Sequence, residues 1–176
     1  TLTAGTFSAP TGDLDVSGNF TVTGGTFTPN AGTLHFNNQI SCTDLTRTID
    51  VNVSLTLGSL TFTGGDYSCD YGKTWTLATG DTLIATGTYT QQKAAGANWG
   101  WPTVDGGTVE ARGNVVIGTG ANGGTTTVTF TGTANQTITQ TAGTTAPRLT
   151  INKSAGTVAL TTNLTSNQTL TVSAGT

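Results

Sequence analysis

One segment recurs along this chain, and its recurrence limits the folds that the chain can adopt. The fullest copy, Leu14–Thr26, alternates apolar with small or polar residues, breaks at a Gly-Asn turn and ends at Gly-Gly. Related copies begin near positions 54, 109 and 164, so that the last two intervals are equal and the first is shorter. Repeats of this kind are typical of architectures in which neighbouring units stack and bury a continuous core. We therefore treat 1–176 as a single domain of stacked repeats.

The alternation within the copies predicts short β-strands. In the segment 33–36, Leu34 and Phe36 point to one face while Thr33 and His35 point to the other. Similar strands follow one another with Gly, Asn, Ser or Asp at each break, and no segment keeps a helical period for three turns. The sequence therefore predicts an all-β fold.

The near-identity of the units favours a solenoid over a sandwich or a propeller. We expect a parallel β-helix of about eight or nine rungs, each of roughly 18–22 residues, with apolar residues stacked inside. Thr suits the outward strand positions, and Gly and Asn suit the corners. The segments 35–53 and 87–107 break the pattern, and we predict that 87–107 is one long loop that leaves the solenoid at a corner.

The composition excludes several classes of protein. Charged residues make up 9% of the chain against about 25% in a typical domain, and the net charge is −3. A disordered chain would combine low hydrophobicity with high net charge. Six dispersed basic residues offer no stripe for nucleic acid, and no apolar run approaches the ~20 residues of a membrane-spanning helix. Because both termini fall inside alternating segments, we expect a segment of a longer protein or assembly.

The two cysteines, Cys42 and Cys69, suggest one disulfide. They form no C-x-x-C motif, and an even number of cysteines in a Thr- and Asn-rich chain is typical of an oxidising compartment. Their separation along the chain is slightly more than one expected rung, which would bring them close on neighbouring coils. Two buried free thiols are the alternative, and a metal pair is less favoured.

Candidate catalytic residues are few, and we predict that the chain is not an enzyme. The single histidine, His35, is expected to point outward, and no G-x-S-x-G motif is present. Asp66, Asp70 and Asp81, near Lys73, come closest to a carboxylate cluster, but they lie at turns where Asp caps its own backbone. We expect no metal site and no cofactor.

The predicted loop carries three aromatic residues, Tyr89, Trp99 and Trp101. Exposed tryptophan on a loop can bind a sugar ring or a protein partner, because its flat apolar face is costly to leave in water. The alternative is that the tryptophans fold back onto the solenoid and fix the loop.

Thr-x-Thr triplets such as Thr61–Thr63 and Thr127–Thr129 allow two interpretations. A flat array of such triplets can bind ice, but it would need them in register on one side of every rung. The unequal repeat spacings favour ordinary surface strands.

Several segments resemble the repeats of very large secreted bacterial β-helix surface proteins, which are adhesin-like and filamentous-haemagglutinin-like. The resemblance lies mainly in segments of the C-terminal third: 124–132, 135–138, 149–153, 156–160 and 164–176. It implies a right-handed β-helix and a secreted stalk, adhesin segment or filament-forming subunit at the bacterial surface. Copies of the chain stacked end to end, or neighbouring repeats of a longer chain, are the expected partners. A glycan-binding module that uses Trp99 and Trp101 is the alternative, and a polysaccharide-active enzyme is less favoured.

Overall fold

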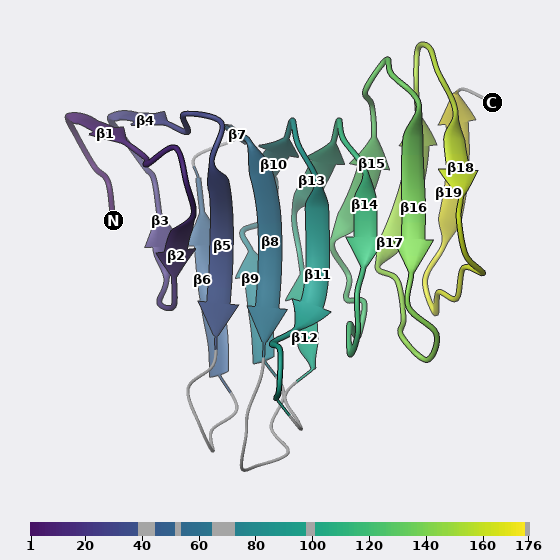
Figure 1. The fold of residues 1–176 in the computed structure, drawn as a ribbon. Coiled ribbons are helices and arrows are strands. Elements are labelled where there is room, and N and C mark those ends of the chain that lie inside the picture. The colour runs from purple at the N-terminus through teal and green to yellow at the C-terminus, as the bar shows by residue number, and fades with distance from the viewer. Residues whose placement is uncertain (39–44, 52–53, 65–72, 98–100, 175–176) are drawn as a thin grey trace.

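The computed structural model describes residues 1–38, 45–51, 54–64, 73–97 and 101–174. These residues form an all-β solenoid without a helix, in which all strand pairs are parallel. Three long sheets run side by side along the axis, and the two chain termini lie at opposite ends of the stack (Figure 1). The expected parallel β-helix is therefore confirmed.

The sheets are named here by the number of strands in their described parts. The seven-stranded sheet contains β2 (Leu14–Val16), β5 (Thr33–Asn38), β8 (Ser59–Gly64), β11 (Tyr89–Lys93), β14 (Val115–Ile117), β16 (Gln136–Gln140) and β18 (Val158–Leu160). The six-stranded sheet contains β7 (Ser54–Leu57), β10 (Thr82–Ala85), β13 (Thr108–Ala111), β15 (Thr127–Phe130), β17 (Arg148–Asn152) and β19 (Leu170–Ala174). The four-stranded sheet contains β3 (Phe20–Thr21), β6 (Leu45–Asp50), β9 (Lys73–Leu77) and β12 (Pro102–Asp105). At the N-terminal end β1 (Thr6–Ser8) pairs with β4 (Thr26–Thr28).

Each turn of the chain visits the three sheets in the same order. From β7 the chain passes to β8, β9 and β10, so that β10 returns to the six-stranded sheet and pairs with β7. After β12 the third face continues without strands, through isolated bridges from Asn122 to Thr145 and from Ala146 to Ser166. The later rungs are therefore narrower than the middle ones.

The rung length differs from the sequence-based expectation. In the six-stranded sheet Leu55 pairs with Leu83 and Leu83 with Val109, so these two rungs are longer than the roughly 18–22 residues expected for a β-helix. Rungs of the expected length lie on either side of these two, where Leu14 pairs with Leu34 and where Val109 pairs with Val128. The repeat unit from 54 to 109 thus contains two wide rungs. The longest sheet has seven strands among the described residues rather than eight or nine.

The predicted excursion at 87–107 is also largely wrong. Its two ends form regular strands: β11 pairs with the rungs on both sides, and β12 pairs with the preceding rung. Polar glutamines and lysine in β11 hide the alternation in the sequence, although Tyr89 and Gln91 both point into the core. Strands of the solenoid therefore account for 89–93 and 102–105 of the predicted loop.

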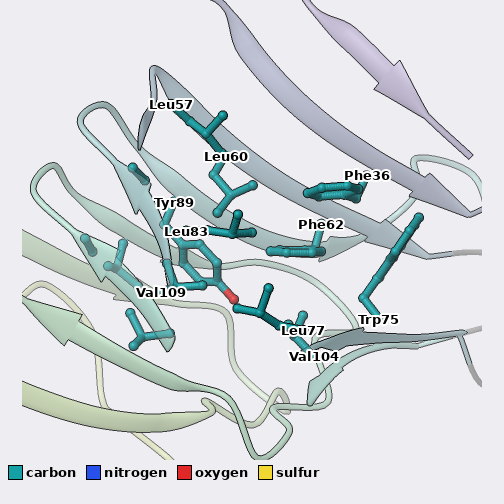
Figure 2. Close-up of a cluster of buried hydrophobic side chains, with 14 of the residues drawn as sticks. Phe36, Leu57, Leu60, Phe62, Trp75, Leu77, Leu83, Tyr89, Val104 and Val109 are labelled. Carbon is teal, nitrogen blue, oxygen red and sulfur yellow. The ribbon is translucent and has the colours of Figure 1, made fainter. Parts of the chain in front are cut away.

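The core is a column of side chains stacked rung upon rung. Phe36 and Phe62 lie on neighbouring strands with stacked rings 5.1 Å apart, and Trp75 packs against both from the four-stranded sheet. Tyr89 continues the column 6.1 Å beyond Phe62 (Figure 2). Towards the C-terminus the column consists mainly of aliphatic residues such as Val115 and Ile138. Each ring is covered by the next rung, which is why the pattern must repeat.

Glycines line the corner that leads into the seven-stranded sheet. A Cβ atom added at Gly32, Gly58 or Gly113 would lie 2.1–2.3 Å from a carbonyl oxygen of the preceding rung. No other residue fits at that distance without a shift of the backbone. The glycine positions in the repeat thus allow close approach of successive rungs.

Polar side chains inside the solenoid are tied to backbone carbonyls at the corners. Gln91 is fully buried and donates to the carbonyls of Pro102 and Gly123 at 2.9 and 2.7 Å. Lys153, which is also buried, donates to the Gln136 side chain at 2.5 Å and to two carbonyl oxygens. Burial lowers the pKa of this ammonium group. These buried side chains therefore link the backbone of neighbouring rungs, and their own polar atoms are satisfied inside the solenoid.

Candidate functional site

The N-terminal end of the solenoid leaves apolar core residues uncovered. A hollow of 290 Å³ opens there between Leu2, Phe7, Leu14, Phe20 and Phe27, among other residues. The Phe7 ring stacks on Phe27 at 5.6 Å and is still 42% exposed. This end therefore presents aromatic rings that have no further rung above them within the described chain.

The C-terminal end also exposes residues that belong to the inward rows. Leu160 is 56% exposed, Leu170 is 48% exposed and Val172 is 61% exposed. Their partners one rung earlier, Ile138, Leu149 and Ile151, are buried or partly buried. The last strands thus have the inside pattern of the core but no next rung in the described chain to cover them.

The three aromatic residues of the predicted contact loop do not share one environment. Tyr89 is fully buried in the core, where burial raises the pKa of its phenol, so it cannot be a surface contact. Trp101 precedes β12 and is 47% exposed, whereas Trp99 lies outside the described residues. Only Trp101 is therefore placed on the surface by the structure.

The predicted disulfide between Cys42 and Cys69 lies outside the described residues, as do Asp66 and Asp70. Asp81 is buried, and its carboxylate accepts a hydrogen bond from the backbone nitrogen of Val51 at 2.7 Å. Asp105 likewise accepts from the backbone nitrogen of Thr125 at 2.8 Å. Each of these turn carboxylates bridges two rungs. Within the described part of the chain, no three His, Cys, Asp or Glu side chains are grouped to hold a metal.

His35 joins three rungs on the outer face of the seven-stranded sheet. Its Nδ1 lies 2.7 Å from the Asp15 carboxylate and its Nε2 lies 2.7 Å from the Thr63 hydroxyl. Sequence reasoning missed this arrangement, because Asp15, His35 and Thr63 become neighbours only when the strand register is known. The order Asp–His–hydroxyl is that of a nucleophile relay.

The environment of Thr63 argues against catalysis by this group. The residue is only 4% exposed, and none of the described hollows is lined by Thr63 or His35. A nucleophile must have room for an acyl carbon about 3 Å from its oxygen. The three side chains therefore form a polar link across β2, β5 and β8.

One charged group on the six-stranded face also connects two rungs. The Glu110 carboxylate accepts from Arg112 and from the Thr131 hydroxyl, each at 2.7 Å. Burial by itself raises the pKa of this carboxyl, but the hydrogen bonds from Arg112 and Thr131 and the Arg112 charge outweigh it, so that the pKa is lowered. The group is a stabilising contact and not a poised acid.

Searches of protein families, curated proteins and solved structures find no match to this chain. No helix capable of crossing a bilayer occurs in the part of the chain that the structure describes. The geometry of the solenoid is therefore the ground on which a function is proposed.

Proposed function

We propose that this chain is a structural module of the bacterial cell surface, a secreted solenoid shaft that acts as a stalk, an adhesin segment or a filament-forming subunit. The observation that carries the proposal is the pair of uncovered ends, because each end presents an apolar row that a further rung would bury. Parallel strands with unpaired edges also offer a row of backbone donors and acceptors to an incoming strand. The shaft is extended either by another copy stacked head to tail or by neighbouring repeats of a longer chain.

The register supports such stacking. One inward row of the seven-stranded sheet begins at Leu14 and runs through Leu34, Leu60, Tyr89, Val115 and Ile138 to Leu160. A second copy placed on the C-terminal end would set its Leu14 over Leu160 and continue the row. A head-to-tail contact of this kind does not close on itself, so it generates a filament.

Negative-stain electron microscopy of the purified chain tests this proposal. We expect concentration-dependent fibres with the width of one solenoid. Leu160→Lys combined with Leu170→Lys introduces charge at the C-terminal end and should abolish the fibres. Ile84→Lys introduces the same charge on the outer face of the six-stranded sheet, where Ile84 pairs with Thr56 and Glu110, and should leave them intact.

Two results would contradict stacking: a wild-type chain that stays monomeric at all concentrations, or fibres that persist in the double lysine variant.

The location at the cell surface is tested separately. Antibody against the chain should label intact producing cells, and labelling that requires permeabilised cells would exclude a surface role.

A further inference from the structure

A further hollow lies beside Trp101. It measures 180 Å³ and is lined by Trp101, Gly120, Ala121, Asn122, Gly143 and Thr145. These residues come from three successive rungs, which are joined here by hydrogen bonds from Asn122 N to Pro102 O at 3.1 Å and from Thr145 N to Ala121 O at 3.0 Å. The hollow is therefore part of the rigid stack.

The hollow arises from the narrowing of the rungs. Trp101 directly precedes β12, the last strand of the four-stranded sheet, and the next rung crosses this face through a single bridge at Asn122. The wide rung therefore extends beyond the narrow rungs that follow. The indole at its edge is left 47% exposed over a shelf made by the narrower rungs.

The indole is held in place although it is exposed. A Cβ atom at Gly120 would lie 3.2 Å from the Trp101 ring and 2.8 Å from the Lys93 side chain, so glycine lets the ring edge approach the backbone. Pro102, the next residue, is buried and its carbonyl accepts hydrogen bonds from Gln91 and Asn122. A fixed aromatic face loses little conformational entropy when a ligand covers it.

The lining indicates the class of ligand. It contains an indole, a carboxamide and a hydroxyl, with small residues between them and no charged side chain. A sugar ring has an apolar C–H face that can stack on the indole and hydroxyl groups that can bond to Asn122 and Thr145. Asn122 donates to Thr103 over 3.4 Å, which leaves donor and acceptor capacity in its amide. None of these lining residues offers a counter-charge to an anionic or cationic ligand, and the charged side chain that packs against Gly120 is that of Lys93.

We propose that this hollow binds one ring of a neutral glycan, with Trp101 as the stacking platform and Asn122 and Thr145 as hydrogen-bonding partners. Its volume is below the ~300–1,000 Å³ of pockets that enclose whole small molecules, so it accepts one ring of a longer glycan. The site lies on the side of the shaft, away from both ends, and it does not depend on head-to-tail stacking.

A glycan array that displays neutral and acidic oligosaccharides tests the proposal, followed by calorimetric titration with the strongest neutral hit. We expect binding of neutral glycans, at least a tenfold loss of affinity in Trp101→Ala and partial retention in Trp101→Tyr. Thr145→Val keeps the branched shape, removes the hydroxyl and should weaken binding several-fold. Phe7→Ala removes an exposed aromatic ring at the N-terminal end and should leave affinity unchanged.

Three outcomes would overturn the site: no binding on the array, binding confined to acidic glycans, or affinity unchanged in Trp101→Ala. Fibre formation is measured on the same variants. Because Trp101 lies far along the chain from the residues of both ends, its substitution should leave the fibres intact, so that failure of the glycan site and failure of the filament proposal can be told apart.

Discussion

Two glycines that look equivalent in the repeat have different surroundings in the fold. Gly113 stands in a corner where a Cβ atom would lie 2.2 Å from the carbonyl oxygen of Gly87. Gly18 is followed by asparagine in the same way, but a Cβ atom there would meet nothing within 4 Å. We expect Gly113→Ala to destabilise the fold by about 1–3 kcal/mol, because the corner must move to admit the methyl group.

The matched variant Gly18→Ala should be neutral or stabilise by up to about 1 kcal/mol, since it restricts only the unfolded chain. Urea unfolding of the two variants measures the difference. Equal effects would contradict the close approach at the Gly113 corner.

Glu110 makes stability depend on pH at a single residue. Its pKa is lowered in the folded protein, so its contribution is present above the ordinary value of 4.5 and is lost as the pH falls through the lower folded value. Wild type should therefore be more stable than Glu110→Gln at pH 7, and the difference should shrink as the pH falls below 4.5 and vanish once this carboxyl is protonated in the folded protein. Urea unfolding at a series of pH values checks this, and a difference that grows in acid would contradict it.

At the scale of the element, a strand contributes to the stability of the fold mainly through the row of side chains that it adds to the core. Phe62 in β8 is fully buried and contacts rings from three other strands, at Phe36, Trp75 and Tyr89. We expect Phe62→Ala to cost about 3–5 kcal/mol, because the rigid rungs cannot close the cavity. Fluorescence-detected unfolding, with the nearby Trp75 as reporter, measures it.

Phe7→Ala is the control for this core substitution. Its ring is 42% exposed and stacks on Phe27, and the substitution removes little besides this stacking. A cost of at most about 1.5 kcal/mol is therefore expected. A loss of stability in Phe62→Ala no larger than in Phe7→Ala would show that the column is not the source of stability.

At the scale of the whole molecule, the solenoid could be predicted from the repeat but its dimensions could not. Alternation placed residues such as Leu34 and Phe36 inside and His35 outside, as the structure has them. The Gly-Asn copies did not mark equivalent places, since Leu14 starts a strand of the seven-stranded sheet whereas Val109 lies in the six-stranded sheet. The Gly-Asn pair stands between β2 and β3 in one copy and between β13 and β14 in the other, so sequence similarity alone does not tell one corner from another.

The neighbours of each candidate residue depend on the strand register, which cannot be read from the sequence alone. The sequence pattern predicts a loop at Tyr89, because the polar residues of β11 point both inward and outward. Gln91 is buried because two carbonyls at a corner accept its amide hydrogens. The link between Asp15, His35 and Thr63 spans three rungs of unequal length. The lengths of the corners decide which residues become neighbours across the rungs. These lengths are set by packing between rungs and not by a local sequence pattern.

The stacking of strands across the axis determines how the shaft responds to force. The two termini lie at opposite ends of the stack (Figure 1), so a pull between them runs along the ladder hydrogen bonds and opens the outermost rung before the next. Each released rung would add about 60–100 Å of extended chain, at ~3.3–3.6 Å for every residue that it contains. Single-molecule stretching should therefore give a series of short extensions at modest force, one rung at a time. A single large rupture would mean that the shaft yields as one body, and such a shaft would not absorb a sudden load gradually.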